Sequence, residues 1–132
     1  MNMENTGAIP VVSIDTSPLT AIDDGHLEGL EKGSAALLVR SGPQKNQKFI
    51  LAGKSIILGR SDEANIVLDD VTVSRTHALI SKDSNTWSIA DRDSLNGTYV
   101  NFIRISDTKL SAGDDIQIGK YRFTFLLPEQ KL

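Results

Sequence analysis

Three short polar clusters hold most of the side chains that could bind a ligand or take part in a reaction. They are Gly59-Arg60, Val73-Ser74-Arg75-Thr76-His77 and Ser94-Leu95-Asn96-Gly97-Thr98. Each cluster lies between short apolar runs, where a β-rich protein places its loops. Together they supply guanidinium groups, a hydroxyl and a carboxamide, which suit phosphate oxygens and a peptide backbone. The clusters therefore predict a binding site for a phosphate ester carried on a peptide.

The same residues give little support to catalysis. His77 follows Ser74 by three residues, but this spacing does not aim the ring at the hydroxyl, and no Asp is identifiable as an orienting third member. The acidic groups fall in predicted turns, where Asp satisfies backbone donors by itself; they are Asp69-Asp70, Asp91, Asp93 and Asp114-Asp115. We therefore expect no enzyme activity, no metal site and no cofactor.

The elements that must position these loops are short strands. Nine short segments are apolar or alternate between apolar and polar residues, and turn residues bound each of them. They are residues 35–40, 48–51, 55–58, 66–68, 77–82, 87–90, 98–100, 115–118 and 121–127. Strands repeated every 8–12 residues, with turn signals between them, are typical of an antiparallel β-sandwich. We predict an all-β domain over residues 34–132.

Residues 1–33 have a different composition. Asp, Ser, Thr, Gly and Pro dominate, and pairs such as Asp24-Gly25 and Lys32-Gly33 would interrupt a helix. This pattern predicts a flexible, acidic regulatory tail. The alternative is a strand at Ile9 to Ile14 that pairs with the domain.

Composition restricts the class of partner. The chain has 132 residues, a net charge of −3 and no cysteine. It carries no basic stripe, so nucleic acid is not expected as a partner. No apolar run approaches the length of a membrane span, and residues 1–5 lack the features of a secretion signal. We expect a cytoplasmic, monomeric protein that does not bind membranes.

About residues 35–127 resemble the forkhead-associated (FHA) domain family. The resemblance is carried by Gly59-Arg60, residues 65–70, residues 73–78, Asp91, residues 94–101, Leu110, Gly113-Asp114 and Ile118-Gly119. It implies a sandwich of about eleven strands whose loops at one end bind phosphothreonine peptides.

The resemblance also implies a role for each loop residue. Arg60 would steady the phosphate and the ligand backbone, Ser74 would donate its hydroxyl to a phosphate oxygen, and Arg75 would add a second cation. Asn96 would hold the ligand main chain.

The remaining loop residues would contact the ligand or support the loops. Ser94 and Leu95 would touch the ligand near the phosphothreonine. His77 would brace the loops; Gly59 can permit an unusual backbone angle. Asn96-Gly97 indicates a tight turn, since both residues tolerate left-handed backbone angles.

A narrower resemblance concerns function. Residues 68–75, 94–101 and 117–120 are similar to small actinobacterial FHA proteins that inhibit 2-oxoglutarate dehydrogenase and tune glutamate metabolism. The similarity implies three partners: a Ser/Thr protein kinase, enzymes of glutamate metabolism such as 2-oxoglutarate dehydrogenase, and the protein's own phosphorylated tail. The alternative is a generic phosphopeptide adaptor that recruits substrates or partners to a kinase.

The tail offers three candidate phosphosites. Thr16 aligns best with the threonines that are phosphorylated in these similar proteins, and Leu19 follows it three residues later. Thr20 is the main alternative, and Thr6, followed by Ile9, is a weaker one. Asp15 stands where the first of the family's paired threonines would be, which removes one phosphosite. A flexible chain of about 20 residues spans roughly 25 Å, so Thr16 could reach its own domain.

Overall fold

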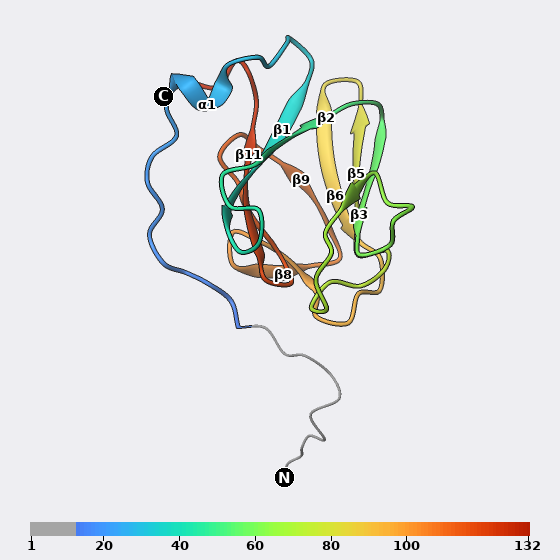
Figure 1. The fold of residues 1–132 in the computed structure, drawn as a ribbon. Helices are drawn as coiled ribbons and strands as arrows, with labels where there is room; N and C mark the ends of the chain where they lie inside the picture. Colours follow the sequence, from blue (N-terminus) through green and yellow to red (C-terminus); the bar gives the residue numbers. More distant parts are fainter. Residues whose placement is uncertain (1–12) are drawn as a thin grey trace.

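Two β-sheets packed face to face form the body of the molecule (Figure 1). The structure is a computed structural model that describes residues 13–132. One sheet has six strands in the order β2 (Lys48–Leu51), β1 (Ala35–Ser41), β11 (Tyr121–Leu126), β10 (Asp115–Ile118), β7 (Thr98–Val100) and β8 (Ile103–Ile105). The other has five strands in the order β4 (Ile66–Val67), β3 (Ser55–Gly59), β5 (Ala78–Asp83), β6 (Thr86–Asp91) and β9 (Asp107–Leu110).

The core lies between the sheets and follows the alternation of each strand. Tyr121, Phe123 and Phe125 of β11 point into it, and the buried Ile80 and Ile89 face them from the five-stranded sheet. Because successive side chains of a strand point to opposite faces, every second residue of β11 must face outward. This pattern confirms the predicted all-β sandwich.

The structure adds two strands that sequence analysis did not mark individually, and one parallel pair. Strand β8 is mostly exposed, and β9 buries only Leu110, so neither shows a strong apolar period. Strands β3 and β4 run parallel, with Leu58 opposite Ile66, whereas the other sheet neighbours are antiparallel.

Strand pairing brings the three polar clusters to one end of the sandwich. Leu58, near the end of β3, pairs with Ala78 at the start of β5, and Ala78 also pairs with Asp91 at the end of β6. The loops that follow Gly59, precede Ala78 and follow Asp91 therefore meet. They lie at the lower end of the molecule in Figure 1.

Residues 13–34 follow the outside of the six-stranded sheet from this end to the opposite one, where β1 begins (Figure 1). They contain one short helical turn, α1 (Asp24–Leu27), whose first turn is capped by Asp23. Sequence analysis expected a flexible segment without a helix. The difference arises because side chains of the sheet hold this segment, and a local sequence pattern does not report such contacts. The domain boundary near residue 34 stays a prediction.

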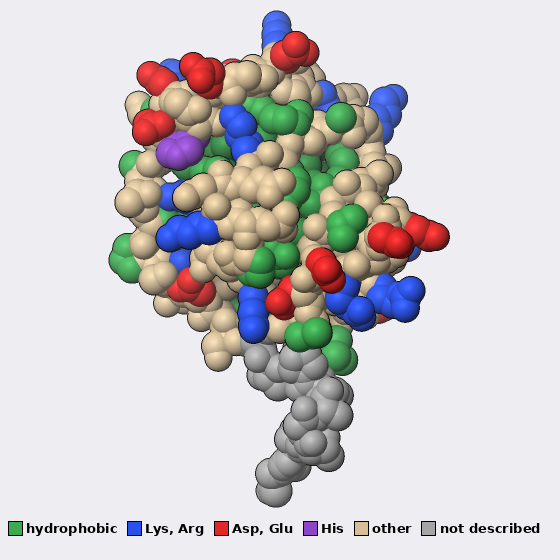
Figure 2. Space-filling view, viewed as in Figure 1, with side chains coloured by type: hydrophobic (Ala, Val, Ile, Leu, Met, Phe, Trp, Pro, Cys, Tyr) green, Lys and Arg blue, Asp and Glu red, His purple; other side chains and the backbone are tan. Residues whose placement is uncertain are grey.

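The surface and the secondary structure can be compared with the expectation that the protein binds neither nucleic acid nor membranes. In the view of Figure 2, acidic and basic side chains are interspersed, and no extended basic area covers this face. Within residues 13–132, no helix is long and apolar enough to cross a membrane. The possible strand at Ile9 to Ile14 falls largely outside the described residues.

Candidate functional site

Gly59 ends β3 at a point where another backbone passes very close. A Cβ atom placed there would lie 2.0 Å from the carbonyl oxygen of Arg75. Gly59 does not have a positive φ, so the expectation of an unusual backbone angle was wrong. The residue is required by the close approach of the loop before β5, which brings that loop against Arg60.

Arg60 is tied to this loop through its backbone and the base of its side chain. Its amide donates to the carbonyl of Ser74 at 3.0 Å, and its Nε donates to the carbonyl of Val73 at 3.0 Å. The side chain is exposed, and within residues 13–132 the two Nη nitrogens make no hydrogen bond. The guanidinium is therefore oriented by one edge and presents its outer nitrogens to solvent, as anion binding requires.

Ser74 is oriented in a similar way. Its Oγ accepts a hydrogen bond from the amide of Leu95 at 3.0 Å. Because a hydroxyl has one hydrogen to donate, this contact leaves the Ser74 hydrogen available for a phosphate oxygen. The side chain of Leu95 is 59% exposed beside it, and Arg75 is also exposed. These groups, with Arg60, are thus brought together at one rim.

His77 is fully buried and joins two of the loops. Its Nδ1 accepts from the amide of Ser74 at 3.1 Å, and its Nε2 lies 2.8 Å from the carbonyl oxygen of Gly97. Since an amide can only donate and a carbonyl can only accept, these partners require a neutral ring with its proton on Nε2. Burial lowers the pKa of His77, which also favours the neutral ring, although the Gly97 carbonyl and Asp91 partly oppose the shift.

This geometry does not fit the Ser–His catalytic pair considered above. His77 contacts the main-chain nitrogen of Ser74, and the Ser74 hydroxyl is bonded to Leu95. Both ring nitrogens are engaged in bracing loops, so the ring has no nitrogen left to take a proton from that hydroxyl.

Ser94 supports the loop before β7 from inside. Its hydroxyl donates to Asp91 at 2.5 Å and accepts from the amide of Gly97 at 2.9 Å. Asp91 also accepts from the Ser94 amide and the Thr98 hydroxyl. Partial burial raises the pKa of Asp91, but these hydrogen bonds outweigh it and hold the pKa below its usual value. The Ser94 side chain is buried and engaged within the loop, unlike the exposed Leu95.

Asn96 and Gly97 form the rim opposite Ser74. The Asn96 side chain donates from Nδ2 to the carbonyl of Thr72 at 2.9 Å, which leaves its oxygen able to accept from a ligand amide. Both residues tolerate left-handed angles, and Gly97 adopts one, with a φ of 87°, whereas Asn96 does not.

Sequence analysis missed the contribution of Thr72. Its hydroxyl donates to Asp70 and accepts from the amide of Lys120, and its carbonyl holds Asn96. Thr72 is buried, and it links the loop before β5 to the β10–β11 turn. The short Asp-x-Thr spacing, which is typical of side-chain-stabilised turns, is the signal that could have identified it.

A broad hollow of the described surface lies at the other end of the sandwich. It has a volume of about 640 Å³ and surrounds Trp87, Lys82 and Pro128. Lys82 lies over the Trp87 ring and donates to the Gly33 carbonyl, so this cation is already engaged. None of the candidate site residues lines it, and within residues 13–132 no group of three or more His, Asp or Glu side chains is placed to hold a metal ion.

Comparison with known proteins agrees with this fold. The model of the FHA domain matches residues 56–119. The chain is 39% identical to the oxoglutarate dehydrogenase inhibitor of Corynebacterium jeikeium, over 93% of this chain and 94% of that protein. It is 45% identical over 100 residues to the glycogen accumulation regulator GarA of Mycobacterium tuberculosis, over 76% of this chain and 62% of GarA. The chain therefore belongs to the FHA-domain family.

Solved structures support the same assignment. One, described as a structural and functional analysis of phosphothreonine-dependent FHA domain interactions, is 30% identical with a TM-score of 0.66 and covers 75% of this chain and 99% of its own. Another, Mycobacterium tuberculosis EmbR in complex with a low-affinity phosphopeptide, is 32% identical with a TM-score of 0.68. It covers 75% of this chain and 26% of EmbR.

Proposed function

We propose that this protein is a non-enzymatic, cytoplasmic regulator whose FHA loops bind phosphothreonine and inhibit metabolic enzymes of the 2-oxoglutarate dehydrogenase type. The proposal rests chiefly on the convergence of Arg60, Ser74 and Asn96 at one end of the sandwich. Each is oriented by one hydrogen bond to the fold and keeps hydrogen-bonding capacity for a ligand: the outer nitrogens of Arg60, the hydroxyl hydrogen of Ser74 and the amide oxygen of Asn96. The inhibitor name carried by relatives that align over nearly the whole chain supports the metabolic part.

Phosphorylation of the tail is the proposed off-switch. A phosphothreonine in the tail would dock on the loops of its own domain and exclude the enzyme, because tethering gives an effective concentration of order mM. No hydrogen bond joins residues 13–33 to the side chains of Arg60, Ser74 or Arg75 in this unmodified chain. Within the described part of the tail, these three side chains are therefore left available for a partner before a kinase acts.

Thr16 remains the proposed phosphosite. It is exposed, and within residues 13–132 its hydroxyl makes no hydrogen bond, whereas the hydroxyl of Thr20 lies 3.1 Å from Arg40. A kinase needs an accessible hydroxyl, which favours Thr16. Thr6 lies outside the described residues.

The phosphate-binding step can be tested with one substitution. Arg60→Ala should weaken binding of a phosphothreonine peptide at least tenfold, since a charged hydrogen bond contributes about 1.5–3 kcal/mol. Isothermal titration calorimetry measures the change, and Arg92→Ala is the matched control because it removes an exposed arginine from a neighbouring loop. Unchanged affinity in Arg60→Ala would contradict the proposed site.

The generic adaptor is the second candidate, and a pull-down separates it from the regulator. The protein is used as bait in cell extract, with and without prior kinase treatment. Loss of dehydrogenase capture after the treatment supports the regulator. Capture of phosphoproteins without the dehydrogenase supports the adaptor.

A further inference from the structure

Strand β11 is buried on both faces, although a two-layer sandwich covers only one. All six of its residues are buried, including the outward-facing Arg122, Thr124 and Leu126. The outer face of an antiparallel sheet is commonly solvated. Here residues 13–30 form a third layer over it, and the contacts between the two are specific.

The first contact is with the main chain of the tail. The side chain of Gln117 accepts from the amide of Asp15 at 2.9 Å and donates to the carbonyl of the same residue at 2.7 Å. Gln117 is 5% exposed and faces outward from β10. Such a paired contact imitates the hydrogen bonds that a neighbouring strand would make, so it selects an extended peptide at this position.

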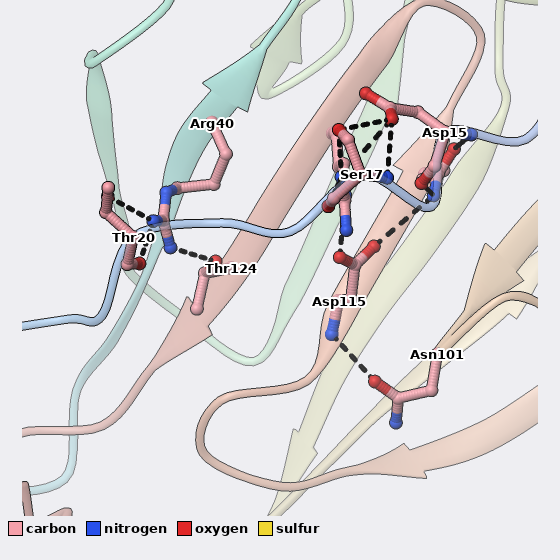
Figure 3. A network of polar contacts seen from close by, with 9 residues as sticks. Asp15, Ser17, Thr20, Arg40, Asn101, Asp115 and Thr124 are labelled. Carbon is pink, nitrogen blue, oxygen red and sulfur yellow. Dashed lines mark hydrogen bonds and ion pairs between the residues drawn. The ribbon is translucent and has the colours of Figure 1, made fainter.

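The second contact involves a buried arginine. Arg122 is 3% exposed, donates from Nη1 to the carbonyl of Ser17 at 2.8 Å and lies 3.4 Å from the carboxylate of Asp15. Its Nε donates to Asp115 at 2.7 Å, and the ring of Phe102 lies 5.5 Å from the guanidinium carbon. Figure 3 shows Asp15 and Ser17 meeting over Asp115.

The third contact is apolar and lies further along the tail. Ile22, Leu27 and Leu30 pack on a separate cluster made by Ala36, Leu38 and Leu126. Between the polar and apolar parts, Arg40 donates to the carbonyl of Thr20 and to the hydroxyl of Thr124 (Figure 3). At the end of α1, Lys48 donates to the carbonyls of His26 and Glu28.

We propose that the outer face of the six-stranded sheet is a second peptide-binding site of this domain, independent of phosphate and occupied by residues 13–30 of the same chain. The side chains of Gln117 and Arg122 bind the polar part, residues 13–20. A further step rests on the proposed function: this sheet site and the phosphothreonine loops compete for the polar part of the tail.

The competition follows from the position of Thr16. It lies between Asp15 and Ser17, whose main-chain carbonyls are both held by the sheet. Thr16 can reach the loops only if these bonds break. If the apolar contacts persist from Ile22 onward, the six residues from Thr16 to Ile22 span at most about 20 Å. The sheet site thus replaces a free tether of about 20 residues with a short, anchored one.

The test uses the unphosphorylated full chain, so the phosphate site plays no part in it. NMR relaxation should give the amides of Asp15 and Ser17 order parameters near those of strands, about 0.85. Gln117→Leu, which keeps the volume and removes the paired contact, should lower them to below about 0.6. Gln47→Leu, the same chemical change in the β1–β2 turn, should have no effect, and neither should Arg60→Ala.

A tail-side variant guards against misfolding of Gln117→Leu. Asp15→Pro removes the amide that Gln117 holds, without touching the domain. If the order parameters at Ser17 are already low in the unmodified chain, or stay high in Asp15→Pro, the sheet site is wrong.

The competition has its own readout. In the chain phosphorylated at Thr16, the side-chain amide protons of Gln117 should lose their protection from solvent exchange. If they stay protected while the loop amides of Ser74 and Asn96 shift, the sheet site stands and the competition is overturned.

Discussion

His77 and Ser74 share a hydrogen bond that fixes the ionisation state of the buried ring. The Ser74 amide donates to Nδ1 at 3.1 Å, so a proton on Nδ1 would place two donors against each other. Nε2 on the other side faces the Gly97 carbonyl at 2.8 Å. The two loops of the proposed phosphate site are therefore joined by a neutral histidine.

This relationship predicts a loss of stability in mild acid. The pKa of His77 is lowered in the folded protein, so the unfolded chain binds more protons between that pKa and the usual 6.5. The contribution of the neutral His77 ring to stability is fully present above pH 6.5 and is lost as the pH falls below that value. The carboxyls of Asp15, Asp70 and Asp91, whose pKa values are also lowered, act only as the pH falls below about 3.8.

Denaturant unfolding between pH 7.5 and 5 measures this effect. The wild-type free energy of unfolding should fall across the interval, and in His77→Gln the fall should be flatter although the variant starts from a lower stability. His26→Gln, at the exposed helical turn, is the control for losing a histidine. Equal slopes in the wild type and His77→Gln would show that another group titrates.

A second prediction concerns Gly59. Gly59→Ala would place a Cβ 2.0 Å from the Arg75 carbonyl oxygen, so the loop before β5 must move. We expect a destabilisation of about 1–3 kcal/mol, with weaker phosphopeptide binding because Arg60 and Ser74 shift together. Thermal unfolding and calorimetry measure the two effects.

Gly25→Ala is the matched control for this clash. Its Cβ would meet only a side-chain oxygen of Asp23, at 3.2 Å, and that side chain can rotate away. If Gly59→Ala is as mild as Gly25→Ala, the close approach at Gly59 is not what sets the loop.

The sequence predicted the sandwich because its central strands alternate clearly, as Tyr121, Phe123 and Phe125 do. It predicted the loop site because the residue types of the three clusters are distinctive. It could not predict why Gly59 is needed, since the residue that approaches it, Arg75, is 16 positions away. The alternation of β11 places Arg122 on the outer face of the sheet, which is commonly solvated. Only the path of the tail shows that it is buried.

A third prediction concerns the ligand. A peptide with phosphothreonine should bind more tightly than the same peptide with phosphoserine. FHA resemblance implies a small apolar pocket for the threonine methyl, and a buried methyl contributes about 0.8 kcal/mol, to which the restricted rotamers of a β-branched residue add. Calorimetry should show a difference of at least about fourfold. Equal affinities would mean that the loops recognise phosphate alone.

The last prediction concerns the switch itself. Phosphorylation of Thr16 should move the amides of Arg60, Ser74, Arg75 and Asn96 in NMR spectra, independently of protein concentration. Leu19 would supply the apolar side chain that FHA sites often recognise three residues after the phosphothreonine. Asp15 cannot replace the phosphate, because one carboxylate lacks its second charge and its geometry.

Variants of the tail identify the phosphosite. Thr16→Ala should prevent the shifts, and Thr20→Ala should leave them in place. Shifts that persist in Thr16→Ala and vanish in Thr20→Ala would assign the switch to Thr20, whose release requires breaking its contacts with Arg40. If tail phosphorylation moves none of the loop amides, docking within one chain is wrong. The loops would then bind phosphothreonine only on other proteins, as the hypothesis of a generic phosphopeptide adaptor requires.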